Sequence, residues 1–101
     1  MLTIDLLKEV GLYCKERTDP NIPRLFAQIK KELEKGGEIL FSIKGVRIIT
    51  PSFIDQLLGD LAKEYGPDFL KQHCKFDPAL PIIFKDQFER SARLRGWKKV
   101  G

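Results

Sequence analysis

The chain has 101 residues, of which 43% are apolar, 32% charged and 10% aromatic, a composition typical of a soluble globular domain. A chain of this length forms one domain whose core is too small to enclose a large cofactor chamber, which argues against a multi-cofactor enzyme. No apolar run reaches the roughly 20 residues that a membrane-spanning helix needs, and Asp5 and Glu9 interrupt the segment where a signal peptide would be apolar. We therefore expect one cytoplasmic domain over residues 1–101.

The net charge of +4 comes entirely from the C-terminal end of the chain. Residues 1–84 hold as many acidic as basic side chains, whereas basic side chains outnumber acidic ones after residue 84. The basic residues of this segment are Lys85, Arg90, Arg93, Arg95, Lys98 and Lys99. A high pI that describes only a basic tail, here residues 95–101, is weak support for nucleic-acid binding by the whole domain.

The few metal-binding and nucleophilic side chains do not form a recognisable site. Cys14 and Cys74 lack any zinc-site spacing and are expected to stay free, largely buried thiols in a reducing compartment. His73 and Cys74 are adjacent, and neighbours on a strand point to opposite faces, so they are not expected to share a catalytic site. Gly36-Gly37 follows a helix and lacks the Lys-Ser/Thr continuation of a phosphate loop. We expect no catalytic residue, no metal and no cofactor.

The N-terminal segment admits two interpretations. Residues 1–7 alternate imperfectly between apolar and polar side chains, which favours a strand, and residues 12–14 can form a second strand paired back on the first. The apolar spacing from Ile4 to Cys14 suits a helix over residues 3–14 nearly as well. Of these we prefer the two strands.

Two amphipathic helices and an apolar strand between them follow. Turn formers at 18–23 precede a helical apolar pattern that Gly36-Gly37 ends. Residues 38–44 are largely apolar and rich in strand formers, which predicts a strand interior to the sheet. Thr50 can cap a second helix, with Pro51 at its first position.

The second helix is predicted to continue to Gly66, because an apolar stripe repeats along it at helical spacing. We expect three members of this stripe, Phe53, Leu57 and Leu61, to be buried against the strand at 39–43.

After Gly66 the chain is predicted to form a helical turn, a short strand at 73–76 and a last helix that starts after the turn at 77–78. In that helix the apolar residues Leu80, Ile83, Phe84 and Phe88 would face inward. Alternating strands and helices predict an α/β fold: a single small domain with a mixed or parallel four-stranded sheet and about three helices.

The stretch from Lys44 to Leu61, KGVRIITPSFIDQLLGDL, resembles the STAS-like family of small bacterial and phage-associated domains of unknown function. The similarity lies in a strand, a Gly-Val turn and a helix that opens in Ser-Phe followed by an acidic residue, and it extends less specifically over residues 2–95. It implies a STAS-like fold and a non-enzymatic regulatory module that binds a protein partner. The partner that it suggests is an ATPase of the histidine-kinase type.

In STAS domains proper, the loop before this helix carries a serine or threonine that a partner kinase phosphorylates. By position that residue corresponds to Pro51, and Ser52 follows one step later, so the resemblance makes Ser52 the candidate phosphosite. A phosphate there would meet free amides and the positive end of the helix dipole. A serine at a helix start also has a structural interpretation, since it hydrogen-bonds locally.

The surface that we expect to bind the partner combines the loop before the second helix with the exposed side of that helix. Its residues are Arg47, Thr50, Ser52, Asp55, Gln56 and Asp60. The two aspartates lie five residues apart, on different sides of the helix, and are expected to be solvated or capping charges.

The alternative, from a different functional class, is a nucleic-acid-binding accessory protein. Its site residues would be Arg90, Arg93, Arg95, Trp97, Lys98 and Lys99. We rank it lower because Asp86 and Glu89 can each neutralise the arginine four residues later, which leaves three uncompensated cations. Trp97 could stack on a base, but an aromatic residue just after an amphipathic helix is expected to fold back onto the core.

Overall fold

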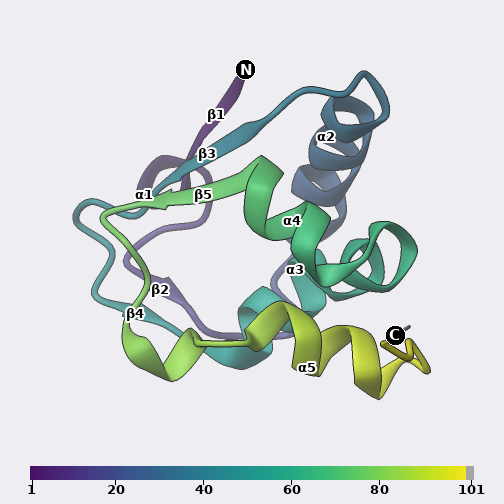
Figure 1. Ribbon diagram of the computed structural model, residues 1–101. Helices are drawn as coiled ribbons and strands as arrows, with labels where there is room; N and C mark the ends of the chain where they lie inside the picture. Colours follow the sequence, from purple (N-terminus) through teal and green to yellow (C-terminus); the bar gives the residue numbers. More distant parts are fainter. Residues whose placement is uncertain (100–101) are drawn as a thin grey trace.

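The computed structural model describes residues 1–99 and is built on a three-stranded, all-parallel sheet (Figure 1). Its strands are β1 (Leu2–Asp5), β3 (Ile39–Ser42) and β5 (Cys74–Asp77). β3 lies in the middle, as its apolar sequence predicted, and pairs with β1 on one side and β5 on the other. Because parallel neighbours need crossover connections, helical segments separate the three strands along the chain.

The two predicted amphipathic helices are present as α2 (Ile22–Glu34) and α3 (Pro51–Tyr65). α2 buries four apolar residues at helical spacing and ends before Gly36, whose φ of 76° is in the left-handed region that favours glycine. α3 ends at Gly66, with φ 93°, and Pro67 then begins α4 (Pro67–His73). The helical turn predicted after Gly66 is therefore a seven-residue helix.

The prediction for the N-terminal segment was wrong in its pairing. After β1 the chain forms one helical turn, α1 (Leu6–Glu9), which Asp5 caps by accepting a hydrogen bond from the Lys8 amide. This turn carries the chain away from β1, so β2 (Tyr13–Cys14) does not pair back on it. β2 instead runs parallel to β4 (Ile48–Ile49), and a helix over 3–14 is also excluded.

The domain is therefore α/β with parallel strands, as predicted, but the details differ. The four-stranded sheet is replaced by the three-stranded sheet and the separate β2–β4 pair. Within residues 1–99 there are five α-helices and one 3₁₀ helix rather than three helices. The extra helices are short, and helices of one or two turns leave little periodic signal in a sequence.

The C-terminal helix begins later than predicted. Residues 78–86, called the strap below, contain only the short 3₁₀ helix η1 (Ile82–Phe84), and α5 (Gln87–Leu94) follows. Pro81 precedes η1 in an extended conformation, and Asp86 before α5 adopts a left-handed φ of 61°, so the helical spacing of the apolar residues is not realised. Ile83, predicted to face inward, is exposed, whereas Phe84 is buried.

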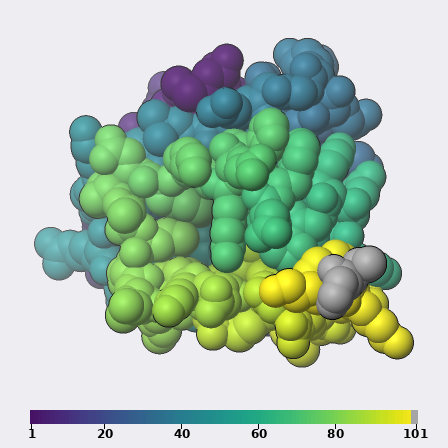
Figure 2. All heavy atoms as spheres, viewed as in Figure 1, coloured from purple at the N-terminus to yellow at the C-terminus, as the bar shows by residue number. Residues whose placement is uncertain are grey.

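α3 is the central helix of the core. Phe53, Leu57 and Leu61 are fully buried, in one apolar cluster with Ile39 and Phe41 of β3. α3 packs against α2 and α4 and, most extensively, against α5. In the space-filling view, β5 and α4 (green) lie directly above the strap and α5 (yellow-green to yellow), which form the lower edge (Figure 2). No helix within residues 1–99 is long and apolar enough to span a membrane.

Candidate functional site

The loop that enters α3 is fixed by Thr50. Its hydroxyl oxygen accepts a hydrogen bond from the Phe53 amide at 3.1 Å and donates to the Lys15 carbonyl at 3.0 Å, while its own carbonyl accepts from Ile54. Pro51 has no amide hydrogen, so only the Ser52 amide is left without a partner at this helix start. A phosphate on Ser52 would therefore meet one free amide rather than the free amides expected, because Thr50 already accepts hydrogen bonds from the next two.

Asp55 is not on the exposed side of α3, contrary to prediction. The residue is 5% exposed, and its carboxylate accepts a hydrogen bond from Arg17 at 2.7 Å and from Nη1 of Arg95 at 2.6 Å. The second Arg95 nitrogen, Nη2, lies 3.2 Å from the other carboxylate oxygen, which makes the Asp55–Arg95 pair bidentate. Asp55 is therefore buried and does not belong to the partner-binding surface for which it was predicted.

Arg95, which follows α5, joins that helix to α3. Its Nε donates to Asp60 at 2.7 Å, and its guanidinium also reaches the Ser91 and Asp55 carbonyls. The guanidinium lies on Gly59, where an added Cβ would overlap it, so the glycine makes the close approach possible. We call Arg95, Asp55, Asp60 and Gly59 the α3–α5 clasp.

The clasp perturbs the pKa of both partners. Burial alone would raise the pKa of Asp55, but hydrogen bonds from Arg95, Ser91 and Arg17 outweigh it and lower that pKa to about 2. The hydrogen bond to Asp55 raises the pKa of Arg95, against the opposing effect of burial. The paired, charged state of the clasp is therefore favoured at neutral pH.

The other predicted surface residues remain accessible. Arg47 and Gln56 are exposed, Thr50 and Ser52 are half-buried, and the Asp60 side chain is exposed although it contacts Arg95. Sequence reasoning missed three apolar residues beside them, on β2 and β4 and just before β2. Leu12, Tyr13 and Ile48 are 44%, 49% and 43% exposed.

These apolar residues are close together. Tyr13 and Ile48 are directly paired in the parallel β2–β4 ladder, and the Leu12 carbonyl accepts from the Arg47 and Ile48 amides. Because β4 runs straight into Thr50 and α3, the apolar residues adjoin the helix start. We call the combined region the α3-start surface: Leu12, Tyr13, Arg47, Ile48, Ser52 and Gln56.

The basic residues proposed for the nucleic-acid alternative are largely engaged within the domain. Arg95 is in the clasp, and Arg93 pairs with Glu89 at 2.6 Å, as predicted. Arg90 does not pair with Asp86: it donates to the Ile83 carbonyl, while Asp86 contacts Lys71 at 3.9 Å. The expectation that Arg95 is uncompensated is wrong.

The end of the described chain is less engaged. Trp97 packs against the core, as predicted, and its amide donates to the Ala92 carbonyl. Lys98 and Lys99 are exposed.

The remaining candidates for chemistry lie apart. His73 ends α4 instead of belonging to the strand, stacks on Phe69 and contacts the Gly37 carbonyl through Nδ1 at 3.2 Å. Cys14 and Cys74 are buried free thiols, and burial raises their pKa to about 11 and about 12. Across residues 1–99 no group of three or more His, Cys, Asp or Glu side chains could hold a metal ion.

Comparison with known proteins identifies a family. A family model described as a STAS-like domain of unknown function matches residues 23–77, just over half of the chain. The matched region runs from α2 to β5 and includes β4 and α3, but not Arg17, the strap or α5. No curated protein and no solved structure matches the chain.

Proposed function

Because the chain belongs to the family of STAS-like domains of unknown function, we propose that it is a non-enzymatic regulatory module that binds a protein partner through the α3-start surface. The observation that carries the proposal is the exposed apolar group of Leu12, Tyr13 and Ile48 beside the start of α3. Exposed aromatic and aliphatic side chains that adjoin one another are typical of the centre of a protein interface.

The charges around this group indicate the chemistry of the partner. Arg47 is exposed at one side, and Arg17 and Lys15 follow β2, with the Lys15 ammonium 5.9 Å from the centre of the Tyr13 ring. Glu16 is the acidic neighbour in this segment, and Asp55 is already paired with arginines. The partner surface should therefore be apolar at its centre and acidic at its rim, because complementary charge favours association.

The family resemblance adds an identity for that partner, an ATPase of the histidine-kinase type, and a mode of control, phosphorylation of Ser52. Ser52 lies three residues before Asp55, which places both on one face of α3. Arg17, which is half exposed, binds Asp55, and Asp55 lies one helical turn from Ser52. A phosphate on Ser52 would compete with Asp55 for Arg17 and change the charge of the α3-start surface.

The nucleic-acid alternative gains no support from the arrangement of the basic C-terminal residues. Arg95 and Arg93 are paired with acidic side chains and Trp97 is packed on the core, so few cations remain to contact phosphates.

The proposal is tested by affinity capture with quantitative mass spectrometry, using the tagged full chain. The disrupting variant is Ile48→Asp with Gln56→Arg, which inserts charges into the α3-start surface. Gln28→Arg places the same arginine on the exposed face of α2 and is the matched control.

A partner captured equally by the parent and Gln28→Arg, and lost from the double variant, would support the proposal. Capture of the same proteins in equal amounts by all three would show that this surface is not the interface. Phosphorylation is read separately, as a phosphopeptide containing Ser52 that the captured ATPase generates and that Ser52→Ala lacks.

A further inference from the structure

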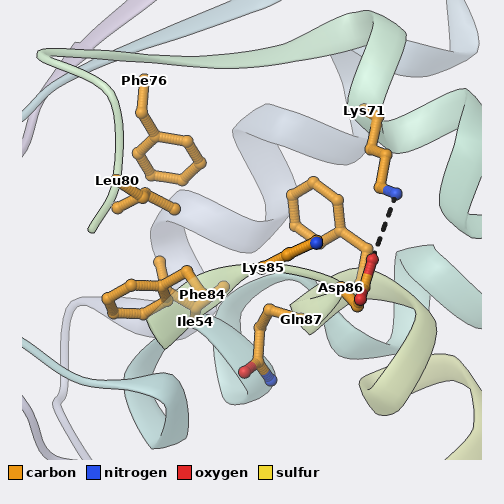
Figure 3. A pocket seen from close by; sticks show the side chains of 9 residues that line it. Ile54, Lys71, Phe76, Leu80, Phe84, Lys85, Asp86 and Gln87 are labelled. Carbon is orange, nitrogen blue, oxygen red and sulfur yellow. Dashed lines mark ion pairs between the residues drawn. The ribbon is translucent and has the colours of Figure 1, made fainter. Parts of the chain in front are cut away.

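A cavity of about 320 Å³ lies between β5, α4, the strap and α5 (Figure 3). Its volume is at the lower end of the range found for small-molecule sites. The apolar side chains that line it are Ile54, Phe76, Leu80, Phe84 and Phe88. They come from four different elements, so the cavity is assembled by the tertiary fold.

The interior of the cavity is almost entirely apolar. Gln87 is the buried polar residue in its lining, and its amide nitrogen already donates to the Ser91 hydroxyl at 2.9 Å. In the part of the chain that the structure describes, no buried side-chain nitrogen or oxygen lacks a hydrogen-bond partner. Since polar groups buried without a partner are costly, the part of a ligand that enters must be apolar.

The remaining lining residues are charged and exposed: Lys71, Lys85 and Asp86. Lys71 and Asp86 approach each other only to 3.9 Å, with about half of each side chain exposed, a geometry that contributes little binding energy. Lys85 makes no ion pair within residues 1–99. In Figure 3 the Lys85 side chain lies among the lining residues, and Lys71 and Asp86 stand together at one side. Two cations against one anion leave a net positive charge.

We propose that this cavity binds a small organic monoanion, a carboxylate with an apolar body. The body occupies the space between Phe84, Phe88 and Leu80, and the carboxylate remains at the exposed rim beside Lys85 and Lys71. A single negative charge complements the net charge of the rim, and an inner lining that is apolar except for the already bonded Gln87 disfavours a ligand with polar groups along its length. This site is separate from the α3-start surface, so it does not depend on the proposed function.

The test is a titration of the full chain with octanoate, followed through the amide signals of its ¹H–¹⁵N NMR spectrum. We expect saturable shifts for Phe84, Gln87 and Phe88 and for neighbouring residues of α4, with unchanged signals in α2. Propionate, which has the charge without the body, and 1-octanol, which has the body without the charge, should both bind at least fivefold more weakly.

Two variants identify the contacts. Lys85→Gln should weaken octanoate binding about threefold at low salt, as expected for an exposed charge. Lys31→Gln, the same change on the exposed face of α2, should leave it unchanged. Leu80→Trp fills the cavity from the strap and should abolish the shifts, while the dispersed spectrum shows that the variant is folded.

Three results would overturn the proposal. The first is the absence of saturable shifts with octanoate. The second is equal affinity for octanol, which would mean that the cavity accepts an uncharged apolar group rather than an acid. The third is an equal affinity of Lys85→Gln and the parent chain.

Discussion

The C-terminal part of the chain is attached to the domain at two places that differ in how closely they are packed. At the α3–α5 clasp, the Arg95 guanidinium lies directly on Gly59 and binds Asp55 and Asp60. The strap, in contrast, has hollows on both sides. One is the 320 Å³ cavity towards α4 and α5, and the other, of about 390 Å³, lies towards β4.

The difference indicates that α5 is held against the domain mainly at its C-terminal end. The strap precedes α5 in the chain and buries Phe84 in the core, but two of its other residues, Ile82 and Ile83, are 88% and 62% exposed. The clasp follows α5 and fixes it to the central helix. Arg95 therefore serves the fold, while the strap is free to line a ligand site.

Of the two attachments, the clasp should show the larger effect when it is lost. Arg95→Met removes the bidentate partner of a buried carboxylate and leaves Arg17 as its remaining cation, so it should cost about 2–3 kcal/mol of the free energy of unfolding, less than a fully unpaired buried charge would. Urea denaturation followed by circular dichroism measures the loss. Arg93→Met, which breaks only the exposed pair with Glu89, is the control and should cost less than about 1 kcal/mol. Equal losses of the free energy of unfolding in the two variants would show that the clasp stabilises the domain no more than an exposed ion pair does.

Acid should weaken the clasp in a defined pH window. The pKa of Asp55 is about 2 in the folded chain against an ordinary 3.8, so the unfolded chain takes up this proton first as the pH falls. Its stabilisation is complete above about pH 4 and is lost towards pH 2, a change of about 2 kcal/mol.

Asp55→Asn isolates this contribution from that of the other carboxylates. The difference in the free energy of unfolding between the parent and this variant should shrink as the pH falls from 4 to 2. A difference that stays constant over this window would show that Asp55 does not carry the pH dependence.

A smaller effect is expected at Gly59, with an unusual sign. Gly→Ala inside a helix normally stabilises by up to about 1 kcal/mol, but here the added methyl group displaces the Arg95 guanidinium. We expect Gly59→Ala to lower the free energy of unfolding by about 1 kcal/mol through this overpacking. In the Arg95→Met background the same substitution should become neutral or stabilising. The same sign in both backgrounds would show that the guanidinium does not occupy this position.

The smallest effect is expected in the strap. Ile82→Ser should change the free energy of unfolding by less than about 0.5 kcal/mol, because the side chain is almost fully exposed. Leu57→Ala in the core gives the scale, with an expected cost of about 2–5 kcal/mol. Thermal melts of both variants measure the contrast, and a large loss for Ile82→Ser would mean that the strap packs more closely than described.

The sequence predicted the elements whose signals are local. α2, α3 and β3 follow from apolar periodicity, from the Thr50 cap and from glycines at their ends. Apolar periodicity gave a wrong prediction for the strap, where a helix was expected. Its apolar residues are spaced as in a helix, but the left-handed backbone at Asp86 delays α5 to Gln87.

Contacts between segments that are distant in the chain could not be predicted from the sequence. β2 and β4 have two residues each, and their pairing joins parts of the chain that no local pattern relates. Asp55 resembled a solvated charge because its partner Arg95 lies 40 residues away. The one available signal was Gly59, since a glycine within an amphipathic helix indicates a close approach. Of the residues predicted for the candidate site, Arg47 and Gln56 are exposed and Ser52 is half-buried, whereas the exposed apolar residues beside them were not identified.

Arg95 stabilises the fold through its pairing with Asp55 and is not available to bind an external anion. A double-mutant cycle of Arg95→Met and Asp55→Asn, measured by urea denaturation at neutral pH, tests it most directly. We expect the double variant to be more stable than the sum of the single losses implies, with a coupling of at least about 2 kcal/mol. Losses that add to within about 0.5 kcal/mol would show that the two residues act independently and that Arg95 does not stabilise the fold through Asp55.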